Sequence, residues 1–449
     1  MSKIRRLKSP LRIDLVLNGD CNHKCAHCYN PWRNGCSETE RFDEDAVIRN
    51  LDRIADELAL NEVWSAVLTG GEPLMHPRVL AFCVRRLNEA GISMSLNTNL
   101  TRMTAELAEG LVKECGWTGM ILTSLPSISP DVCDEITRAP GSFGRIMKGI
   151  ETCRNAGIRV GVNAVVTKRN LADLPRFADF AEKNRLEYVS LSTVIPPAYD
   201  PDNPVWWLDA DDVRAVADAL VEVKERAGAE IGSVVPLPLC LLGDAEKYMP
   251  VLETTCTAGV GKCSVNAVTG EVNACGHGDA SCGSVLTDGL AKCWKRMEKW
   301  GEDEILADEC RNCGWLFLCG GECRMMRRMR KIAGKTGSEA PYVLNPEAEI
   351  RFPARSGAEA PVVGDDEKFR VRSGMKTRRE EFGYVVRFGF TETMMSDAMF
   401  GFLSALREKG TFTMGEAASM TSDPETGKEL MRTLLFRGAL ERSGADEER

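Results

Sequence analysis

Three cysteines near the N-terminus, Cys21, Cys25 and Cys28, have the spacing CxxxCxxC. They follow an apolar run at residues 13–17 that predicts a short buried strand, and Gly19 ends that run. The cysteines are therefore expected on a loop at the carboxyl end of a strand. A loop can wrap three thiolates around one [4Fe–4S] cluster, whose fourth iron then has no protein ligand and is open to a cofactor or substrate.

Zinc is the alternative occupant of this loop. Structural zinc takes four ligands, usually from two cysteine pairs. No second cysteine pair follows nearby, although His23, His27 and Cys36 are close in sequence. The ligand count therefore favours an iron–sulfur cluster.

A second motif, LTGGEPL at residues 68–74, follows the next apolar run at residues 63–68. Gly70 and Gly71 predict an exposed turn with free backbone groups, and Glu72 can accept a hydrogen bond from an ammonium group. Together with the cysteine spacing, this motif resembles the radical S-adenosylmethionine (SAM) enzymes.

The resemblance implies a role for each motif residue. Cys21, Cys25 and Cys28 would hold the cluster, and the open iron would chelate the amino and carboxylate groups of SAM. The GGEP turn, with Gly70, Gly71 and Glu72, would meet the SAM amino group, and His27 would lie against the adenine. We also expect Tyr29 and Asn99 in the SAM site.

Composition limits the class of protein. The 449 residues predict two or three domains, and a hydrophobic fraction of 43% is ample for their cores. A net charge of −9 disfavours a nucleic-acid partner. The chain has no apolar run of membrane-spanning length and no signal-peptide pattern at its start, so we expect a cytoplasmic protein without a membrane partner. In such a chain, eighteen cysteines indicate metal or cluster ligands rather than disulfides.

Residues 10–228 alternate apolar, strand-like runs with amphipathic, helix-like patterns. Six such units predict an α/β fold with a parallel sheet and outer helices, a partial (β/α)6 barrel of the radical SAM type. Ligands bind at the carboxyl ends of the strands in such folds, where both motifs fall. The expected strands are 12–17, 63–68, 92–97, 118–124, 158–166 and 187–194, and the expected helices are 43–58, 77–90, 103–115, 143–156, 171–183 and 210–226.

Polar residues follow later strands. Ser124 closes the fourth strand, Asn163 lies in the fifth, and Arg138 precedes a helix start at residues 141–143. This pattern resembles the radical SAM subgroup with a cysteine-rich extension, in which the serine, arginine and asparagine contact the ribose or carboxylate of SAM. Hydroxyl and amide groups suit ribose, and a guanidinium suits a carboxylate. Ordinary turn residues and a surface ion pair are the alternative interpretations.

Within residues 229–332, the stretch 256–323 contains nine of the eighteen cysteines, too many for core packing alone. A CxxC pair there is typical of zinc or iron–sulfur sites. The full spacing resembles the SPASM extension, which holds up to two auxiliary [4Fe–4S] clusters. The resemblance implies Cys256, Cys263, Cys275 and Cys323 as ligands of the first, and Cys310, Cys313 and Cys319 as ligands of the second.

One departure from the SPASM pattern concerns the second cluster. No cysteine follows Cys323, so the usual last ligand is missing. The second site could keep an open iron, use a residue other than cysteine, use Cys282 or Cys293, or be absent, and a zinc ribbon is a further alternative. The single cysteines at positions 83, 115, 133, 153 and 240 are interpreted as small buried hydrophobic residues.

Residues 333–366 predict a linker, and residues 367–449 predict a small α+β, winged-helix-like domain. We expect strands at 369–372 and 382–390 and helices at 396–409, 413–420 and 425–437. The stretch from Arg378 to Gly383 with the elements after it is similar to the peptide-recognition chaperones of pyrroloquinoline quinone and mycofactocin biosynthesis. Those domains bind a leader peptide by adding it as a strand to a sheet. No strongly basic recognition helix supports DNA binding.

These features predict a radical SAM/SPASM maturase. It would cleave SAM reductively to a 5′-deoxyadenosyl radical and abstract hydrogen from a ribosomally made precursor peptide, which it crosslinks, epimerises or otherwise modifies. Residues 367–449 would hold the leader, and flavodoxin or ferredoxin would donate electrons. The alternatives are an enzyme acting on an alcohol, a sugar, a tetrapyrrole or a sulfatase, and an iron–sulfur electron carrier, which would need no site for the SAM amino group.

Overall fold

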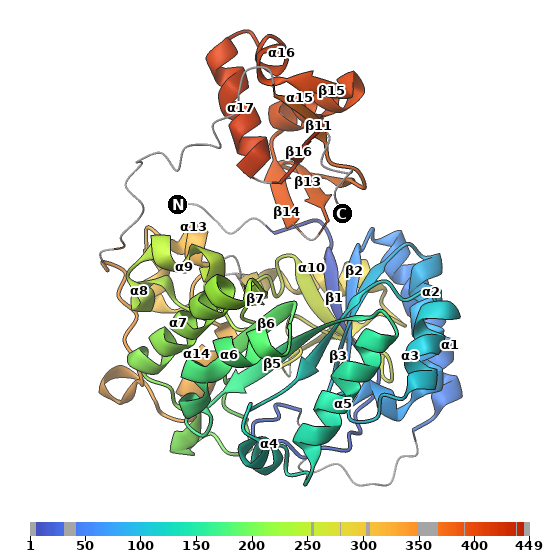
Figure 1. Cartoon of the computed structure of the whole chain (residues 1–449), viewed down its shortest axis with the longest axis vertical. Coiled ribbons are helices and arrows are strands. Elements are labelled where there is room, and N and C mark those ends of the chain that lie inside the picture. Colours follow the sequence, from blue (N-terminus) through green and yellow to red (C-terminus); the bar gives the residue numbers. More distant parts are fainter. Residues whose placement is uncertain are drawn as a thin grey trace. The chain divides into compact units, whose positions relative to one another are not determined.

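The computed structural model describes residues 6–30, 42–252, 256–278, 280–301, 306–348, 350, 367–389, 391–436 and 438–443. The chain forms two compact units, Met1–Phe352 and Pro353–Arg449 (Figure 1). The division falls inside the predicted linker, and the barrel and cysteine-rich regions belong to the first unit together. Cys36 lies outside the described residues.

A ten-stranded sheet forms the centre of the first unit, in the order β10-β9-β8-β1-β2-β3-β4-β5-β6-β7. Strands β1 to β7 pair in parallel. This arrangement confirms the α/β class and the partial barrel. The bounds of these strands are β1 Arg12–Val16, β2 Ser65–Thr69, β3 Ser93–Thr98, β4 Met120–Ser124, β5 Arg159–Val166, β6 Tyr188–Thr193 and β7 Glu230–Gly232.

Helices connect these strands and lie along the outer side of the sheet (Figure 1). They bury one apolar face each, as α1 does with Val47, Leu51, Ile54 and Leu58. The helices are α1 Glu44–Leu60, α2 Pro77–Glu89, α3 Ala105–Lys113, α4 Pro130–Thr137, α5 Ser142–Asn155, α6 Phe177–Lys183 and α7 Ala210–Ala227, with short 3-10 helices η2 Pro73–Met75, η3 Leu171–Arg176 and η4 Pro204–Trp206.

The strands and helices predicted for residues 10–228 are present within a few residues of their predicted bounds. Helix α4 was not predicted, because it has eight residues and buries little more than Cys133 and Ile136. That is too short for a helical period to emerge from the sequence.

The cysteine-rich region extends the same sheet. Strand β8 pairs in parallel with β1, and β9 and β10 follow as antiparallel neighbours. Short helices complete the region. Its elements are α8 Leu239–Leu242, α9 Ala245–Leu252, β8 Lys262–Asn266, β9 Glu271–Asn273, β10 Ser281–Ser284, α10 Leu290–Arg296, α11 Glu298–Gly301, α12 Asp308–Arg311, α13 Leu316–Cys319, α14 Arg324–Ile332 and η5 Gly337–Glu339.

The second unit is a small α+β, winged-helix-like structure around its own core, which includes Phe369, Phe388 and Phe412. It has two three-stranded antiparallel sheets, β12-β13-β14 and β15-β11-β16. Its elements are β11 Lys368–Val371, β12 Lys376–Glu380, β13 Gly383–Phe388, β14 Thr391–Met395, α15 Asp397–Lys409, β15 Thr411–Thr413, α16 Met414–Ala418, α17 Pro424–Phe436 and β16 Leu440–Arg442.

Strand β12 was not predicted because its sequence, KTRRE, is polar and charged. Within it Arg378 and Glu380 point to the same face and are fully buried, and Arg378 Nε lies 2.7 Å from Glu380 Oε1. Arg379 points to the opposite face, is exposed, and forms an ion pair with Asp397. Two adjacent arginines therefore occupy opposite environments.

Across the described residues, no helix is both long enough and apolar enough to cross a membrane.

We predict that Arg378→Met destabilises the second unit by about 3–5 kcal/mol, because it leaves the Glu380 carboxylate buried without its cation. Arg379→Met is the matched control and should cost about 1 kcal/mol, since it breaks an exposed ion pair with Asp397 and a cation–π contact with Tyr384. Hydrogen exchange of β12–β14 in the full chain measures both. Equal loss of protection in the two variants would contradict the prediction.

Candidate active site

The cysteine loop, residues 18–30, follows β1 and is held by backbone hydrogen bonds to the end of α4. The Lys24 N–H donates to the Thr137 carbonyl at 3.1 Å, and the Ala26 N–H donates to the Ile136 carbonyl at 2.8 Å. The unpredicted helix α4 therefore serves as the support of the loop.

Two side-chain contacts add to this support. The buried His23 places Nε2 3.1 Å from Ser142 Oγ, at the start of α5. The Tyr199 hydroxyl donates to the Ala26 carbonyl at 2.6 Å. The loop is thus also held by the start of α5 and by the segment that follows β6.

The GGEP turn is joined to the cysteine loop by backbone groups. The Gly71 N–H donates to the Asn18 carbonyl and the Glu72 N–H donates to the Asp20 carbonyl, both at 2.8 Å. Asn18 Nδ2 donates back to the Glu72 carbonyl at 3.0 Å. A Cβ on Gly71 would lie 2.0 Å from the Asp20 oxygen, and one on Gly70 would lie 2.6 Å from the Asn18 oxygen, so neither position admits a side chain.

Glu72 is buried, and its carboxylate already has protein donors. It accepts from the Thr98 hydroxyl at 2.6 Å, the Asn99 N–H at 2.7 Å and the Leu74 N–H at 2.9 Å. Burial raises the pKa of Glu72, and these hydrogen bonds act against that rise. That this carboxylate meets an ammonium group stays a prediction; in the structure it ties the turn to the end of β3.

Asn99 links the same strand end to the first cysteine. Its Nδ2 donates to Asn22 Oδ1 at 2.9 Å and lies 3.8 Å from Cys21 Sγ, within donor distance of sulfur. The His23 N–H donates to the same sulfur at 3.4 Å. Such N–H donors stabilise negative charge on a ligating thiolate.

His27 and Tyr29 flank the third cysteine. His27 Nδ1 is buried and has no hydrogen-bond partner among the described residues, and burial lowers the pKa of His27 to about 4. The Tyr29 ring packs on His277 with centroids 3.7 Å apart, and burial raises the pKa of Tyr29. Tyr29 therefore connects the cysteine loop to the cysteine-rich region, a link the sequence did not predict.

Three polar residues were expected near the ends of later strands. One lies at the end of β4 (Ser124), one beside it on β5 (Asn163) and one at the end of α4 (Arg138). Ser124 and Asn163 lie directly opposite each other on β4 and β5. Asn163 Oδ1 accepts from Ser192 Oγ on β6 at 3.1 Å. Arg138 is exposed at the end of α4, in the left-handed conformation with φ 51°, next to the Thr137 carbonyl that holds the cysteine loop.

Cys256, Cys275 and Cys323 lie together in the cysteine-rich region. Burial raises the pKa of Cys323 to about 12, and the nearby thiols of Cys256 and Cys275 add to the rise. His277 Nδ1 lies 3.9 Å from Cys275 Sγ. These residues are three of the four predicted for the first auxiliary cluster, with a histidine beside them that sequence reasoning missed.

Cys263, the fourth predicted member, lies elsewhere. Asp14 raises the pKa of the neighbouring Lys262, and the thiols of Cys275 and Cys256 raise it further, so Lys262 faces that group. Side chains alternate along β8, and Cys263 therefore points to the opposite face. There burial raises its pKa, and its thiol neighbours are Cys293 and Cys282. The structure thus separates Cys263 from the set predicted for it.

Cys310, Cys313 and Cys319, predicted for the second auxiliary cluster, line one cavity together with Cys240 from α8. None of the cysteines in the described ranges forms a disulfide. In those ranges no three histidine, cysteine or acidic side chains converge closely enough to hold a single metal ion. An iron–sulfur cube carries its irons at separate corners, and its ligands stand further apart than those of one ion.

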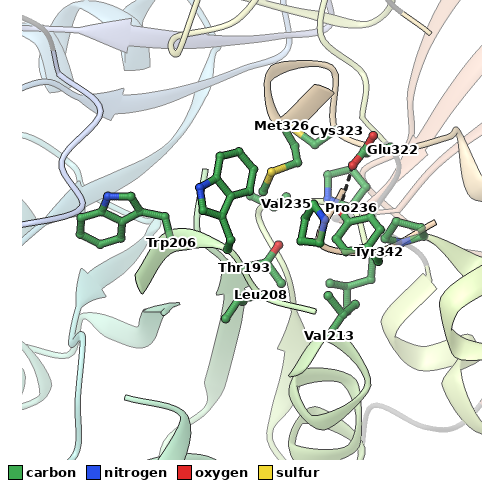
Figure 2. A pocket seen from close by; sticks show the side chains of 14 residues that line it. Thr193, Trp206, Leu208, Val213, Val235, Pro236, Glu322, Cys323, Met326 and Tyr342 are labelled. Atoms are coloured by element: carbon green, nitrogen blue, oxygen red, sulfur yellow. Dashed lines mark hydrogen bonds between the residues drawn. The ribbon is translucent and has the colours of Figure 1, made fainter. Parts of the chain in front are cut away.

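A second, largely apolar cavity of about 380 Å³, including its opening, lies at the carboxyl end of β6 (Figure 2). Thr193, Trp206, Trp207 and Met326 contribute to its wall, and Cys323 lines it from the first auxiliary group. Glu322 is the one acidic residue of this wall.

Glu322 is buried, and one of its two carboxylate oxygens, Oε1, is paired with a tyrosine and an arginine, while Oε2 has no hydrogen-bond partner among the described residues. It accepts from the Tyr342 hydroxyl at 2.8 Å, as Figure 2 shows, and pairs with Arg330. Burial raises the pKa of Glu322, while Arg330 acts to lower it. The Glu322 carboxylate therefore lies in a buried, apolar part of the cavity wall and has Arg330 as its cationic partner.

Comparison with known proteins agrees with this geometry. Residues 15–181 match the model of the Radical SAM superfamily. The AdoMet-dependent heme synthase of Methanosarcina barkeri is 23% identical, over 76% of this chain and 98% of that protein. Mycofactocin maturase MftC of Mycobacterium tuberculosis is 27% identical, over 71% of this chain and 79% of that protein. The structure of Streptococcus suis SuiB bound to its precursor peptide SuiA is similar in fold, with a TM-score of 0.55 and 17% identity, over 71% of this chain and 73% of SuiB.

The fold and the joined cysteine loop and GGEP turn define a SAM-dependent iron–sulfur enzyme. Residues 15–181 of the chain form a Radical SAM domain. Its cofactors are a [4Fe–4S] cluster and SAM, and its cysteine-rich region fits a SPASM domain for auxiliary clusters.

We predict that Gly71→Ala costs about 1–3 kcal/mol of stability and most of the SAM cleavage, because the new methyl group must displace the Asp20 backbone. Gly144→Ala in α5 is the matched control: no atom lies within 4 Å of its added Cβ, so it should be neutral or slightly stabilising. Thermal melting and 5′-deoxyadenosine formation measure the two effects. Wild-type values for Gly71→Ala would show that the turn and the loop are not tightly joined.

Proposed function

We propose that this protein is a radical SAM maturase that modifies a ribosomally made precursor peptide. The observation that carries the proposal is the combination, in one chain, of a cysteine loop joined to the GGEP turn and a separate unit that contains two three-stranded antiparallel sheets. MftC, a maturase by name, aligns with 71% of the chain and supports the same direction.

The residues of the first unit fit the cluster and SAM. Cys21, Cys25 and Cys28 are half-buried thiols on one loop, and Cys21 already receives two N–H donors. The buried, unpartnered Nδ1 of His27 leaves a polar atom for a ligand to satisfy. These three cysteines would hold the cluster, and SAM would lie between the loop and the GGEP turn. When bound, the two cofactors supply the one-electron chemistry that removes a hydrogen atom from an unactivated carbon.

The chain's own residues position and enclose that chemistry. The Glu72 carboxylate fixes the turn to β3, and Asn99 fixes the loop to the same strand end. Ser124, Asn163 and Arg138 offer two polar side chains and one cation to the ribose and carboxylate of SAM. The apolar cavity beside Cys323 would receive a substrate side chain, since indole and thioether walls exclude water.

The second unit would hold the leader. In the described part of its sheet β12-β13-β14, the two outer strands each have one neighbour. An extended peptide can add to such an edge through backbone hydrogen bonds, with little demand on its sequence. This mode places affinity in the leader and leaves the rest of the peptide free to enter the first unit.

We assign the reaction to the cytoplasm, with a flavodoxin or ferredoxin as electron donor. Unbridged cysteines such as those of the described ranges persist in reducing compartments, and reduced carriers of low potential are found there. Neither nucleic acid nor a membrane is needed.

A second candidate is a radical SAM enzyme that acts on a small molecule such as a tetrapyrrole. The alignment with the M. barkeri heme synthase spans 98% of that relative and favours this alternative. A modification that depends on a precursor peptide separates the two functions, because a small-molecule enzyme would turn over without one.

We predict that Cys25→Ala abolishes SAM cleavage, because two thiolates do not hold the SAM-binding cluster. Cys153→Ala is the control, since Cys153 is buried in the core on α5. The measurement is 5′-deoxyadenosine formed per chain under chemical reduction without air. Full activity of Cys25→Ala would exclude the assigned cluster site.

We predict that removing residues 367–449 weakens precursor binding at least tenfold, or about 1.4 kcal/mol. SAM cleavage without peptide should stay within about twofold of the full chain, because residues 1–352 are a compact unit. Fluorescence anisotropy of a labelled precursor gives the affinity, and a leaderless peptide is the control. If the truncated chain bound the precursor as tightly as the full chain, residues 367–449 would not be the site that recognises the leader.

A further inference from the structure

Cys240 is a cysteine that sequence reasoning placed in the hydrophobic core. In the structure it is half-buried in α8, a single turn between Pro238 and Gly243. It lines the cavity that Cys310, Cys313 and Cys319 also line. A residue some seventy positions before the CxxC pair therefore meets it in space.

The cavity is apolar apart from its four thiols and one carboxylate. Leu239, Trp315, Leu316 and Leu344 form much of its wall. The carboxylate is Glu322, whose Oε1 pairs with Arg330 and Tyr342, while its buried Oε2 has no hydrogen-bond partner among the described residues. A soft metal centre prefers thiolate to carboxylate, so the four thiols are the favoured ligands in this wall.

Electrostatic interactions place the four thiols near one another. The thiols of Cys319 and Cys313 are electrostatic neighbours of Cys240. The thiols of Cys319 and Cys240 are likewise neighbours of Cys310. Cys240 also packs against the small apolar cluster that contains Cys310. Each thiol therefore has at least two of the others nearby.

A backbone hydrogen bond ties α8 to the same group. The Leu239 N–H donates to Cys319 Sγ at 3.4 Å. One turn thus supplies an N–H to one sulfur and presents its next residue, Cys240, to the same cavity. N–H donors to sulfur are a regular feature of iron–sulfur sites.

The other substitutes considered from the sequence lie elsewhere. Cys282 and Cys293 are the thiol neighbours of Cys263 beside β8. Neither lines the cavity. Cys240 is therefore the described cysteine that completes a set of four with Cys310, Cys313 and Cys319.

We propose that Cys240 is the fourth ligand of the second auxiliary [4Fe–4S] cluster, in place of the cysteine expected after Cys323. The inference rests on the auxiliary clusters of the proposed function and identifies their missing ligand. Four thiolates leave no iron open, so this cluster transfers electrons and does not bind substrate.

The test compares iron, sulfide, zinc and the paramagnetic spectrum of the full chain, purified without air. The variants are Cys240→Ala, Cys319→Ala and, as control, the core substitution Cys153→Ala. Three four-iron clusters give about twelve irons per chain. We expect Cys319→Ala and Cys240→Ala to lose the same cluster signal, or to convert it to a three-iron form, while Cys153→Ala keeps it.

Three outcomes would overturn the proposal. They are a Cys240→Ala protein with the iron content and spectrum of the wild type, a Cys319→Ala protein that loses no cluster, and zinc in place of iron at this site. If Cys240→Ala does not fold, Cys240→Ser keeps the volume and an oxygen ligand. We expect its cluster to show a shifted reduction potential, and an unshifted potential would also overturn the proposal.

These readouts do not depend on the substrate. A wild-type protein whose second cluster depends on Cys240, but which modifies no precursor peptide, would refute the peptide function and leave the ligand assignment standing. An enzyme that modifies a precursor peptide, but whose clusters are unchanged by Cys240→Ala, would refute the ligand assignment and leave the peptide function standing.

Discussion

The pairing of backbone groups between Asn18–Asp20 and Gly71–Glu72 is the constraint on which the candidate active site depends. These hydrogen bonds extend the contact of the parallel strands β1 and β2 beyond their carboxyl ends, into the two loops that carry the motifs. They require no side chain at Gly71, and the Asp20 oxygen leaves no room for one. The relative position of the cysteine loop and the turn is thereby set by main-chain geometry, which does not vary with rotamers or surface charge.

Glu72 carries this constraint to the third strand. An ionised carboxylate at a buried position is costly unless donors surround it, and Thr98, Asn99 and Leu74 supply them. Asn99 then uses its side chain on Asn22 and Cys21. One buried carboxylate thus holds three consecutive strand ends together. Its three hydrogen-bond donors offset the free-energy cost of removing it from water.

Sequence periodicity and motif spacing were sufficient for the barrel, the cysteine loop and the GGEP turn, since each is local in the chain. The structure departs from the sequence-based expectations where local patterns and three-dimensional surroundings differ. Strand β12 is polar in sequence, but Arg378 and Glu380 satisfy each other inside the second unit. Cys263 fits a ligand spacing, yet the alternation of β8 turns it away from Cys275. Spacing counts residues along the chain and does not record which face of a strand a side chain takes.

The sequence around Cys240 predicted a core position, because its neighbours Leu239 and Leu241 are apolar, whereas the structure places Cys240 in the wall of the cavity lined by Cys310, Cys313 and Cys319.

The walls of the two cavities also explain why the two auxiliary sites need not be independent. Glu322 and Pro238 line both cavities, and Glu322 directly precedes Cys323 of the first group. Only three residues separate Cys319 of one site from Cys323 of the other. A closed four-cysteine cluster at the first of these positions would therefore be joined to the other site by a segment of three residues and by one shared wall that contains the buried, ion-paired Glu322. This arrangement suits electron transfer between the two sites, while substrate chemistry takes place in the apolar cavity at the end of β6.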